Sequence, residues 1–105
     1  MSPSSELVPV SMEKPKLTVP SVHLNGTSFA GLRDPLVRAG SDISSAIGTL
    51  AECAPHGRDY YVQGEDAYAK ARDEHLSRIA RLQSVLDEIK IIARQVQKAQ
   101  DARGR

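Results

Sequence analysis

The sequence has no tryptophan, one phenylalanine and three tyrosines among its 105 residues. A core with so few aromatic side chains is too small to enclose the pocket that most metabolic enzymes use. The single cysteine, Cys53, excludes an internal disulfide and a site built from several thiolates. No apolar run approaches the roughly 20 residues of a membrane span. We therefore expect one small domain that is not an enzyme, binds no metal and needs no cofactor.

Charge is also nearly balanced, with 14 basic and 13 acidic side chains and a net charge of +1. Such a balance gives no indication of a nucleic-acid or membrane partner. One local exception is a stripe of basic residues near the C-terminus, which recur every four residues and could follow phosphates. A solvated face at the negative end of a helix is the simpler explanation. The stripe consists of Lys90, Arg94 and Lys98.

Prolines characterise the first part of the chain, where four of them occur within 20 residues. At this spacing they block helix formation and remove hydrogen-bond donors that a sheet would need. Residues 19–24 alternate apolar and polar side chains, and Asn25-Gly26 is a pair typical of tight turns. The sequence therefore predicts an extended, partly disordered arm over residues 1–24. It either lies free on the surface or docks as a strand over an apolar seam.

The first helix has two possible starts, at Phe29 or at Pro35. Pro35 would interrupt a helix that begins at Phe29, at a cost of about 3 kcal/mol. Asp34 and Pro35 instead suit the cap and the first position of a helix, which favours the later start. Apolar side chains then recur at spacings of three and four. The prediction is a helix over about 35–53 and a loop over 54–64.

The second helix is the strongest pattern in the sequence. Neither proline nor glycine interrupts residues 65–103, and apolar side chains recur every three or four residues from Tyr68 to Val96. This period is that of a helix with a coiled-coil-like seam. We predict a helix over about 65–100, and hence an all-α helical hairpin over residues 25–105 with a long second helix.

The unequal lengths of the two helices suggest an oligomer. A first helix of roughly 27 Å covers only about half of a second helix of about 50 Å, so the half beyond Leu82 would be exposed. Monomers rarely leave such an apolar strip uncovered, so we expect a homo-oligomer. The predicted interface comprises Leu82, Leu86, Ile89, Ala93 and Val96. His75 lies on the same seam, where a lone polar residue more often sets register than binds a ligand.

The loop at 54–64 is longer than a turn between two helices requires. Aromatic faces beside a guanidinium can stack a base and hold a phosphate, so the loop is a candidate ligand site. The turn before the first helix could supply further polar contacts. Alternatively, the tyrosines cap the hairpin core and the adjacent charges pair with each other. The candidate ligand-binding residues are Arg58, Asp59, Tyr60, Tyr61, His23 and Asn25.

Two segments resemble a group of small proteins of tailed phages and prophages. Residues 23–28 read His-Leu-Asn-Gly-Thr-Ser, and residues 55–64 contain Arg-Asp-Tyr-Tyr before the long helix. The resemblance covers about residues 22–96. Val62 stands where a proline is expected, and Pro35 departs from the more regular first helix of the group. The resemblance implies a phage-encoded protein in the cytoplasm of the bacterial host and carries no established activity.

This setting yields two hypotheses for function. Small accessory phage proteins often bind a host factor or sequester a defence signal, an analogy at the level of setting. The first hypothesis is a counter-defence protein that sequesters a phosphorylated small molecule, such as a nucleotide signal, at the loop and a subunit contact. The alternative is a structural or protein-interaction module whose long helix and arm dock a host or virion protein.

Overall fold

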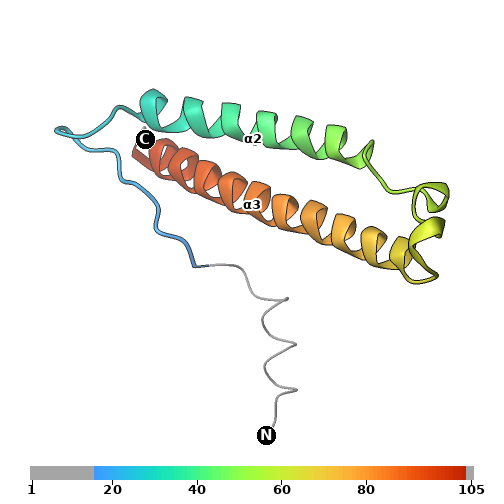
Figure 1. Cartoon of the computed structure of the whole chain (residues 1–105). Coiled ribbons are helices and arrows are strands. Elements are labelled where there is room, and N and C mark those ends of the chain that lie inside the picture. Colours follow the sequence, from blue (N-terminus) through green and yellow to red (C-terminus); the bar gives the residue numbers. More distant parts are fainter. Residues whose placement is uncertain (1–15, 104–105) are drawn as a thin grey trace, which may run out of the picture.

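The computed structural model describes residues 16–103 as two antiparallel helices preceded by an extended arm (Figure 1). The elements in chain order are α2 (Phe29–Ala51), the short 3-10 helices η1 (Gly57–Asp59) and η2 (Tyr61–Gln63), and α3 (Ala67–Arg103). No strand occurs among these described residues. The predicted all-α hairpin with a long second helix is therefore confirmed. The predictions for residues 1–15 and 104–105 lie outside the described residues.

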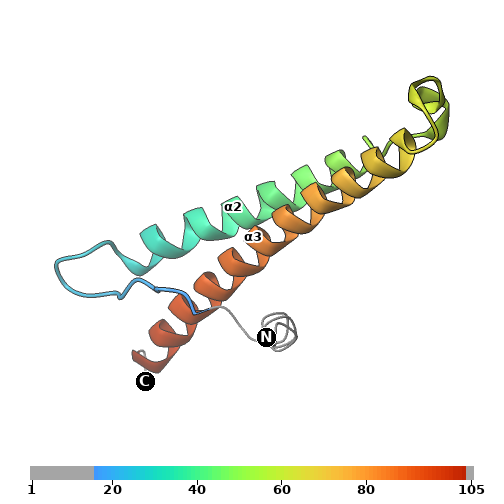
Figure 2. The same ribbon diagram turned by 60° about the horizontal axis from the view of Figure 1, so that its bottom comes forward.

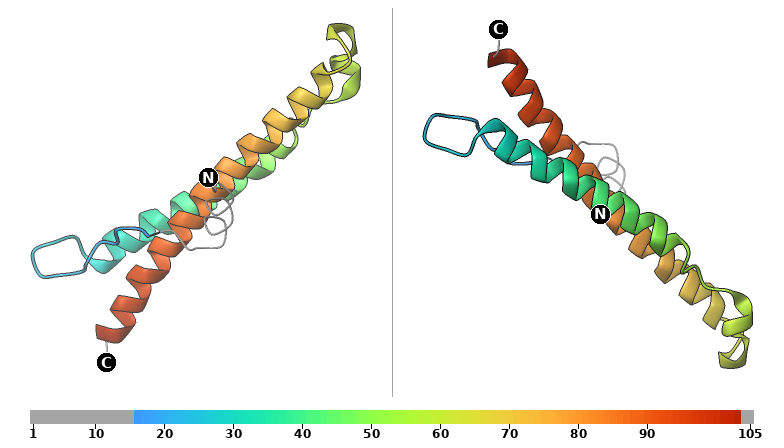
Figure 3. Two further views of the ribbon diagram at one scale, coloured as in Figure 1. Left: turned by 90° about the horizontal axis from the view of Figure 1, so that it is seen from below. Right: turned by 90° about the horizontal axis from the view of Figure 1, so that it is seen from above.

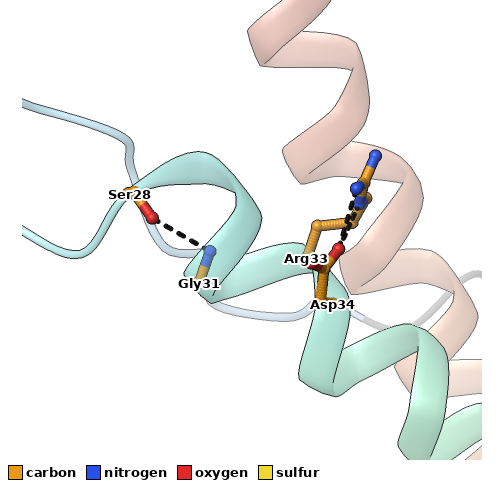
Figure 4. Close-up of polar contacts among 4 residues, drawn as sticks. All are labelled: Ser28, Gly31, Arg33 and Asp34. Atoms are coloured by element: carbon orange, nitrogen blue, oxygen red, sulfur yellow. Dashed lines mark hydrogen bonds and ion pairs between the residues drawn. The ribbon is translucent and has the colours of Figure 1, made fainter.

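α2 begins at Phe29 and not at Pro35, so the predicted start is wrong by six residues. Ser28 caps the helix, and its Oγ accepts a hydrogen bond of 3.0 Å from the N–H of Gly31 (Figure 4). Pro35 lies inside the helix and has no N–H to donate to the Gly31 carbonyl. Both residues are exposed, so water can hydrate that carbonyl. The helix ends at Ala51, two residues before the predicted end.

The early start is favourable because it buries apolar surface. Phe29 and Leu32 are half-buried, and the Arg33 guanidinium lies 4.9 Å from the centroid of the Phe29 ring. Arg33 also pairs with Asp34, with 2.8 Å between Nη2 and Oδ1 (Figure 4). A cap contributes about 1 kcal/mol, and half-burial of each large side chain contributes about as much again. Together these terms offset the cost of about 3 kcal/mol for an internal proline.

α2 covers the apolar seam of α3 within one chain. A Cβ atom at Gly40 of α2 would lie 3.7 Å from Leu86 Cδ1 and 3.9 Å from Ile89 Cγ2. Leu86 and Val96 are buried. The half-buried seam residues are Leu82, Ile89 and Ala93. The prediction that the first helix leaves this half of α3 uncovered is therefore wrong, because α2 starts earlier and is 23 residues long.

The arm docks against the hairpin. Residues 16–22, here called the docked arm, run beside the C-terminal part of α3 (Figures 1 and 2). Leu17, Val19 and Val22 are half-buried, whereas the residues between them are exposed. The Arg103 guanidinium donates a hydrogen bond to the Val22 carbonyl. Of the two interpretations of the arm, docking is the one that these residues support.

Candidate functional site

The connection between the helices forms one end of the hairpin, and we call residues 57–66 the tip (Figure 1). Backbone hydrogen bonds fold it into two tight turns. The N–H of Tyr60 donates to the Gly57 carbonyl at 3.0 Å, and that of Gln63 to the Tyr60 carbonyl at 2.9 Å. Gly64 has a φ of 122°, which favours glycine, and directs the chain into α3. The tip is thus an ordered structure.

The tip turns two large apolar side chains toward solvent. Tyr61 is 74% exposed and Val62 is 77% exposed, whereas Tyr60 is half-buried. The alternative prediction, that the tyrosines cap the hairpin core, therefore fits Tyr60 and does not fit Tyr61. Arg58 and Asp59 are exposed beside them. The sequence placed all of these residues in one loop but contained no signal for the direction of each side chain.

An open hollow of about 510 Å³ lies between the tip and the start of α3. Three carboxylates, those of Glu65, Asp66 and Glu74, belong to residues of its lining, and Lys70 supplies the single cation. A phosphate in this hollow would experience net repulsion, because the three negative charges outnumber the one positive charge. Arg58 is not part of the lining. The hollow is better suited to a cationic or neutral group than to a nucleotide.

His23 and Asn25 lie at the other end of α2, in the turn that precedes it. The N–H of Gly26 donates to the His23 carbonyl at 3.1 Å, so a turn forms here as predicted, but Leu24 and Asn25 are at its centre, one position earlier than the predicted pair. The 23 residues of α2 separate this turn from Arg58 by about 35 Å. The structure therefore does not bring the six candidate residues into one site within a chain. The length of α2 keeps the two groups of residues at opposite ends of the hairpin.

A second hollow, of about 400 Å³, lies along the groove between α2 and α3. Val37 of α2 and Ile89 and Ala93 of α3 contribute apolar lining. Two members of the basic stripe, Lys90 and Arg94, also line it. These cations thus border an apolar groove on one side of the hairpin.

His75 is the one buried polar side chain in the described part of the chain, with 6% exposed. Its Nε2 has no hydrogen-bond partner among those residues. The burial of His75 confirms the prediction that it lies on the packed seam of α3. Between residues 16 and 103, no group of three His, Cys, Asp or Glu side chains could hold a metal ion. The described helices also lack a segment long and apolar enough to cross a membrane.

No protein-family model matches the chain, and no curated protein and no solved structure matches it either. The resemblance to phage proteins therefore stays a prediction. The capture of a phosphorylated molecule and the homo-oligomer also stay predictions.

Proposed function

We propose that the chain is a non-enzymatic protein-interaction module whose tip docks a partner protein. The observation that supports this is the exposure of two adjacent apolar side chains, Tyr61 and Val62, on an ordered tip. Tyrosine and arginine are among the residues that most often dominate binding energy at protein interfaces, and Arg58 lies nearby in the chain. A loop that is already ordered loses little conformational entropy when it binds.

The charges around the tip indicate the chemistry of the partner. Asp59, Glu65 and Asp66 supply three carboxylates against the one guanidinium of Arg58. An apolar centre with a charged rim is the usual anatomy of a protein interface. The partner that fits has an apolar pocket for Tyr61, bordered by basic side chains that complement the acidic rim.

Site-specific photo-crosslinking in the organism that encodes the chain tests this proposal. A photoreactive amino acid replaces Val62 in one variant and Val37 in the control, since Val37 is also more than half exposed but lies on α2. We expect one discrete protein adduct from position 62 and none of that mass from position 37. The same adducts from both positions, or no adduct from position 62, would overturn the proposal.

Once the partner is known, its affinity for purified variants gives a quantitative test. Tyr61→Ser combined with Val62→Ser should weaken binding at least tenfold, whereas Val37→Ser should not. All three residues are exposed, so the free energy of unfolding should change by less than about 1 kcal/mol. Glu65→Lys with Asp66→Lys should also weaken binding, and more so at low salt.

A nucleotide panel distinguishes this function from the capture of a phosphorylated molecule. We expect no nucleotide to raise the thermal unfolding temperature of the wild-type chain. A nucleotide that raises it, with the effect abolished by Arg58→Ala, would replace the interaction function with ligand capture. The hairpin should remain intact in that variant, because Arg58 is exposed.

A further inference from the structure

The hollow between α2 and α3 has the dimensions of a small-molecule site. Its volume of about 400 Å³ lies within the range of about 300–1,000 Å³ that is typical of such sites. The two helices cross at an angle and diverge toward the start of α2 (Figure 3). The lining on α2 runs from Leu36 to Ser44, so the hollow is roughly 12 Å long. It therefore offers room for one small, elongated molecule.

Gly40 helps to keep this hollow open. It lines the hollow together with Ile89 of α3. A Cβ atom at position 40 would lie 3.9 Å from Ile89 Cγ2, so a side chain there would occupy space between the two helices. Glycine weakens a helix relative to alanine, and the packing of the chain does not require it here. Gly40 thus preserves the hollow although it weakens the helix.

The charged residues of the lining are both basic, namely Lys90 and Arg94. They are exposed, lie about one turn apart on α3 and form no ion pair with another residue in the described part of the chain. Asp87 precedes Lys90 by three positions, but its carboxylate accepts a hydrogen bond of 3.0 Å from Gln83. The hollow therefore combines an apolar surface with two cations that no carboxylate of the lining neutralises.

We propose that this hollow binds an aliphatic carboxylate, such as a medium-chain fatty acid. The aliphatic chain lies against the apolar lining, which includes Val37, Ile89 and Ala93. Burial of its methylene groups supplies affinity. The carboxylate binds Lys90 and Arg94, and a guanidinium suits this group because it can donate two parallel hydrogen bonds. The site does not depend on the role proposed for the tip.

Two other occupants fit this hollow less well. A second copy that docks through the same groove would bring Lys90 and Arg94 of both chains into one interface, because a two-fold contact pairs a patch with itself. A partner helix needs apolar contacts over two or more turns. Val37 is the one strongly exposed large apolar side chain of α2, so the apolar surface is local.

Calorimetric titration of the full chain with dodecanoate, below the concentration at which it forms micelles, tests the site. We expect saturable binding of one molecule per chain. Acetate carries the same charged group without the chain, and dodecyltrimethylammonium carries the same chain with a positive charge. Each should bind at least tenfold more weakly. Equal affinity for dodecanoate and the ammonium would overturn the proposal, because the two cations would then play no part.

A pair of charge reversals tests the assigned cations. Arg94→Glu should weaken dodecanoate binding at least tenfold. Lys98→Glu is the matched control, since Lys98 is an exposed member of the same basic stripe but does not line the hollow. It should change the affinity by less than twofold. Equal losses in the two variants would show that net charge alone attracts dodecanoate, and would contradict a site at Arg94.

A pair of glycine replacements tests the place of the aliphatic chain. Gly40→Ala should weaken dodecanoate binding several-fold although it favours the helix. Gly48→Ala should leave the affinity unchanged, because Gly48 has open space around it and does not line the hollow. Circular dichroism checks that both variants stay helical. Unchanged affinity in Gly40→Ala would place the chain outside the hollow and overturn the assignment.

The absence of saturable dodecanoate binding would also overturn the proposal, and two further measurements would then identify the occupant. A dimer that Arg94→Glu strengthens would point to a second copy, because the reversal removes repulsion between like charges. A discrete protein adduct from a photoreactive residue at position 37 would point to a partner helix.

Discussion

Gly40 of α2 lies against Leu86 of α3 at a distance that an added methyl group would fill. A Cβ atom at position 40 would be 3.7 Å from Leu86 Cδ1, which is ordinary van der Waals contact. The helices therefore approach each other closely at this point without requiring a glycine. Gly48, two turns further along α2, has open space around it. Neither glycine is explained by packing within the chain.

Replacement of either glycine by alanine should stabilise the hairpin. Gly40→Ala and Gly48→Ala should each raise the free energy of unfolding by about 1 kcal/mol, because alanine loses less backbone entropy in a helix. Urea unfolding followed by circular dichroism measures the change. A loss of stability for Gly40→Ala, with a gain for Gly48→Ala, would mean that the helices pack more closely than the structure shows.

The start of α2 can be tested with three exposed residues. Ser28→Ala should lower stability by about 1 kcal/mol through loss of the cap, whereas Pro35→Ala should raise it by up to about 3 kcal/mol by restoring a helical hydrogen bond. Asp34→Ala removes only a surface ion pair and should cost less than about 1 kcal/mol. The opposite ranking, with Asp34→Ala costly and Ser28→Ala neutral, would place the start at Pro35.

Burial of the α3 seam within one chain predicts a stability change that does not depend on concentration. Leu86→Ala should lower the free energy of unfolding by about 2–5 kcal/mol, and Val85→Ala by less than about 1 kcal/mol. The shift in unfolding temperature for Leu86→Ala should be the same at all protein concentrations. A shift that shrinks as the concentration rises would instead place Leu86 in a subunit interface.

His75 should be replaceable by an apolar side chain with a gain in stability. Its Nε2 is buried and has no partner in the described part of the chain, so His75→Leu should raise the free energy of unfolding by about 1 kcal/mol. His75→Ala should lower it, because it leaves a cavity. Thermal unfolding of both variants measures these changes. A loss of stability in His75→Leu would indicate that Nε2 has a partner in an assembly.

The helices were predictable because their signals are local. α3 matches its prediction to within three residues at each end, since no proline or glycine competes with its apolar period. The start of α2 was not predictable by the same rules. They weigh Pro35 against a cap at Ser28, and they do not include the half-burial of Phe29 and Leu32 in the folded chain.

The candidate site was only partly predictable for a similar reason. Arg58 and Tyr61 are close in the chain, so their presence in one loop follows from the sequence. The outward direction of Tyr61 depends on the hydrogen bonds and packing of the folded tip. His23 lies away from this loop because α2, which is 23 residues long, separates the two ends of the hairpin.

By itself, the sequence determined that the described chain contains two long helices joined by a loop, because proline, glycine and the apolar period act over a few residues. It also determined that a turn forms near Asn25 and that residues 16–22 form neither helix nor strand. Only the tertiary structure decided that α2 covers the seam of α3, that Tyr61 faces solvent and that the arm docks. The covered seam and the docked arm depend on contacts between residues far apart in the chain, such as Val22 and Arg103, whose pairing no local pattern encodes. The exposure of Tyr61 depends on the way the turns of the tip fold.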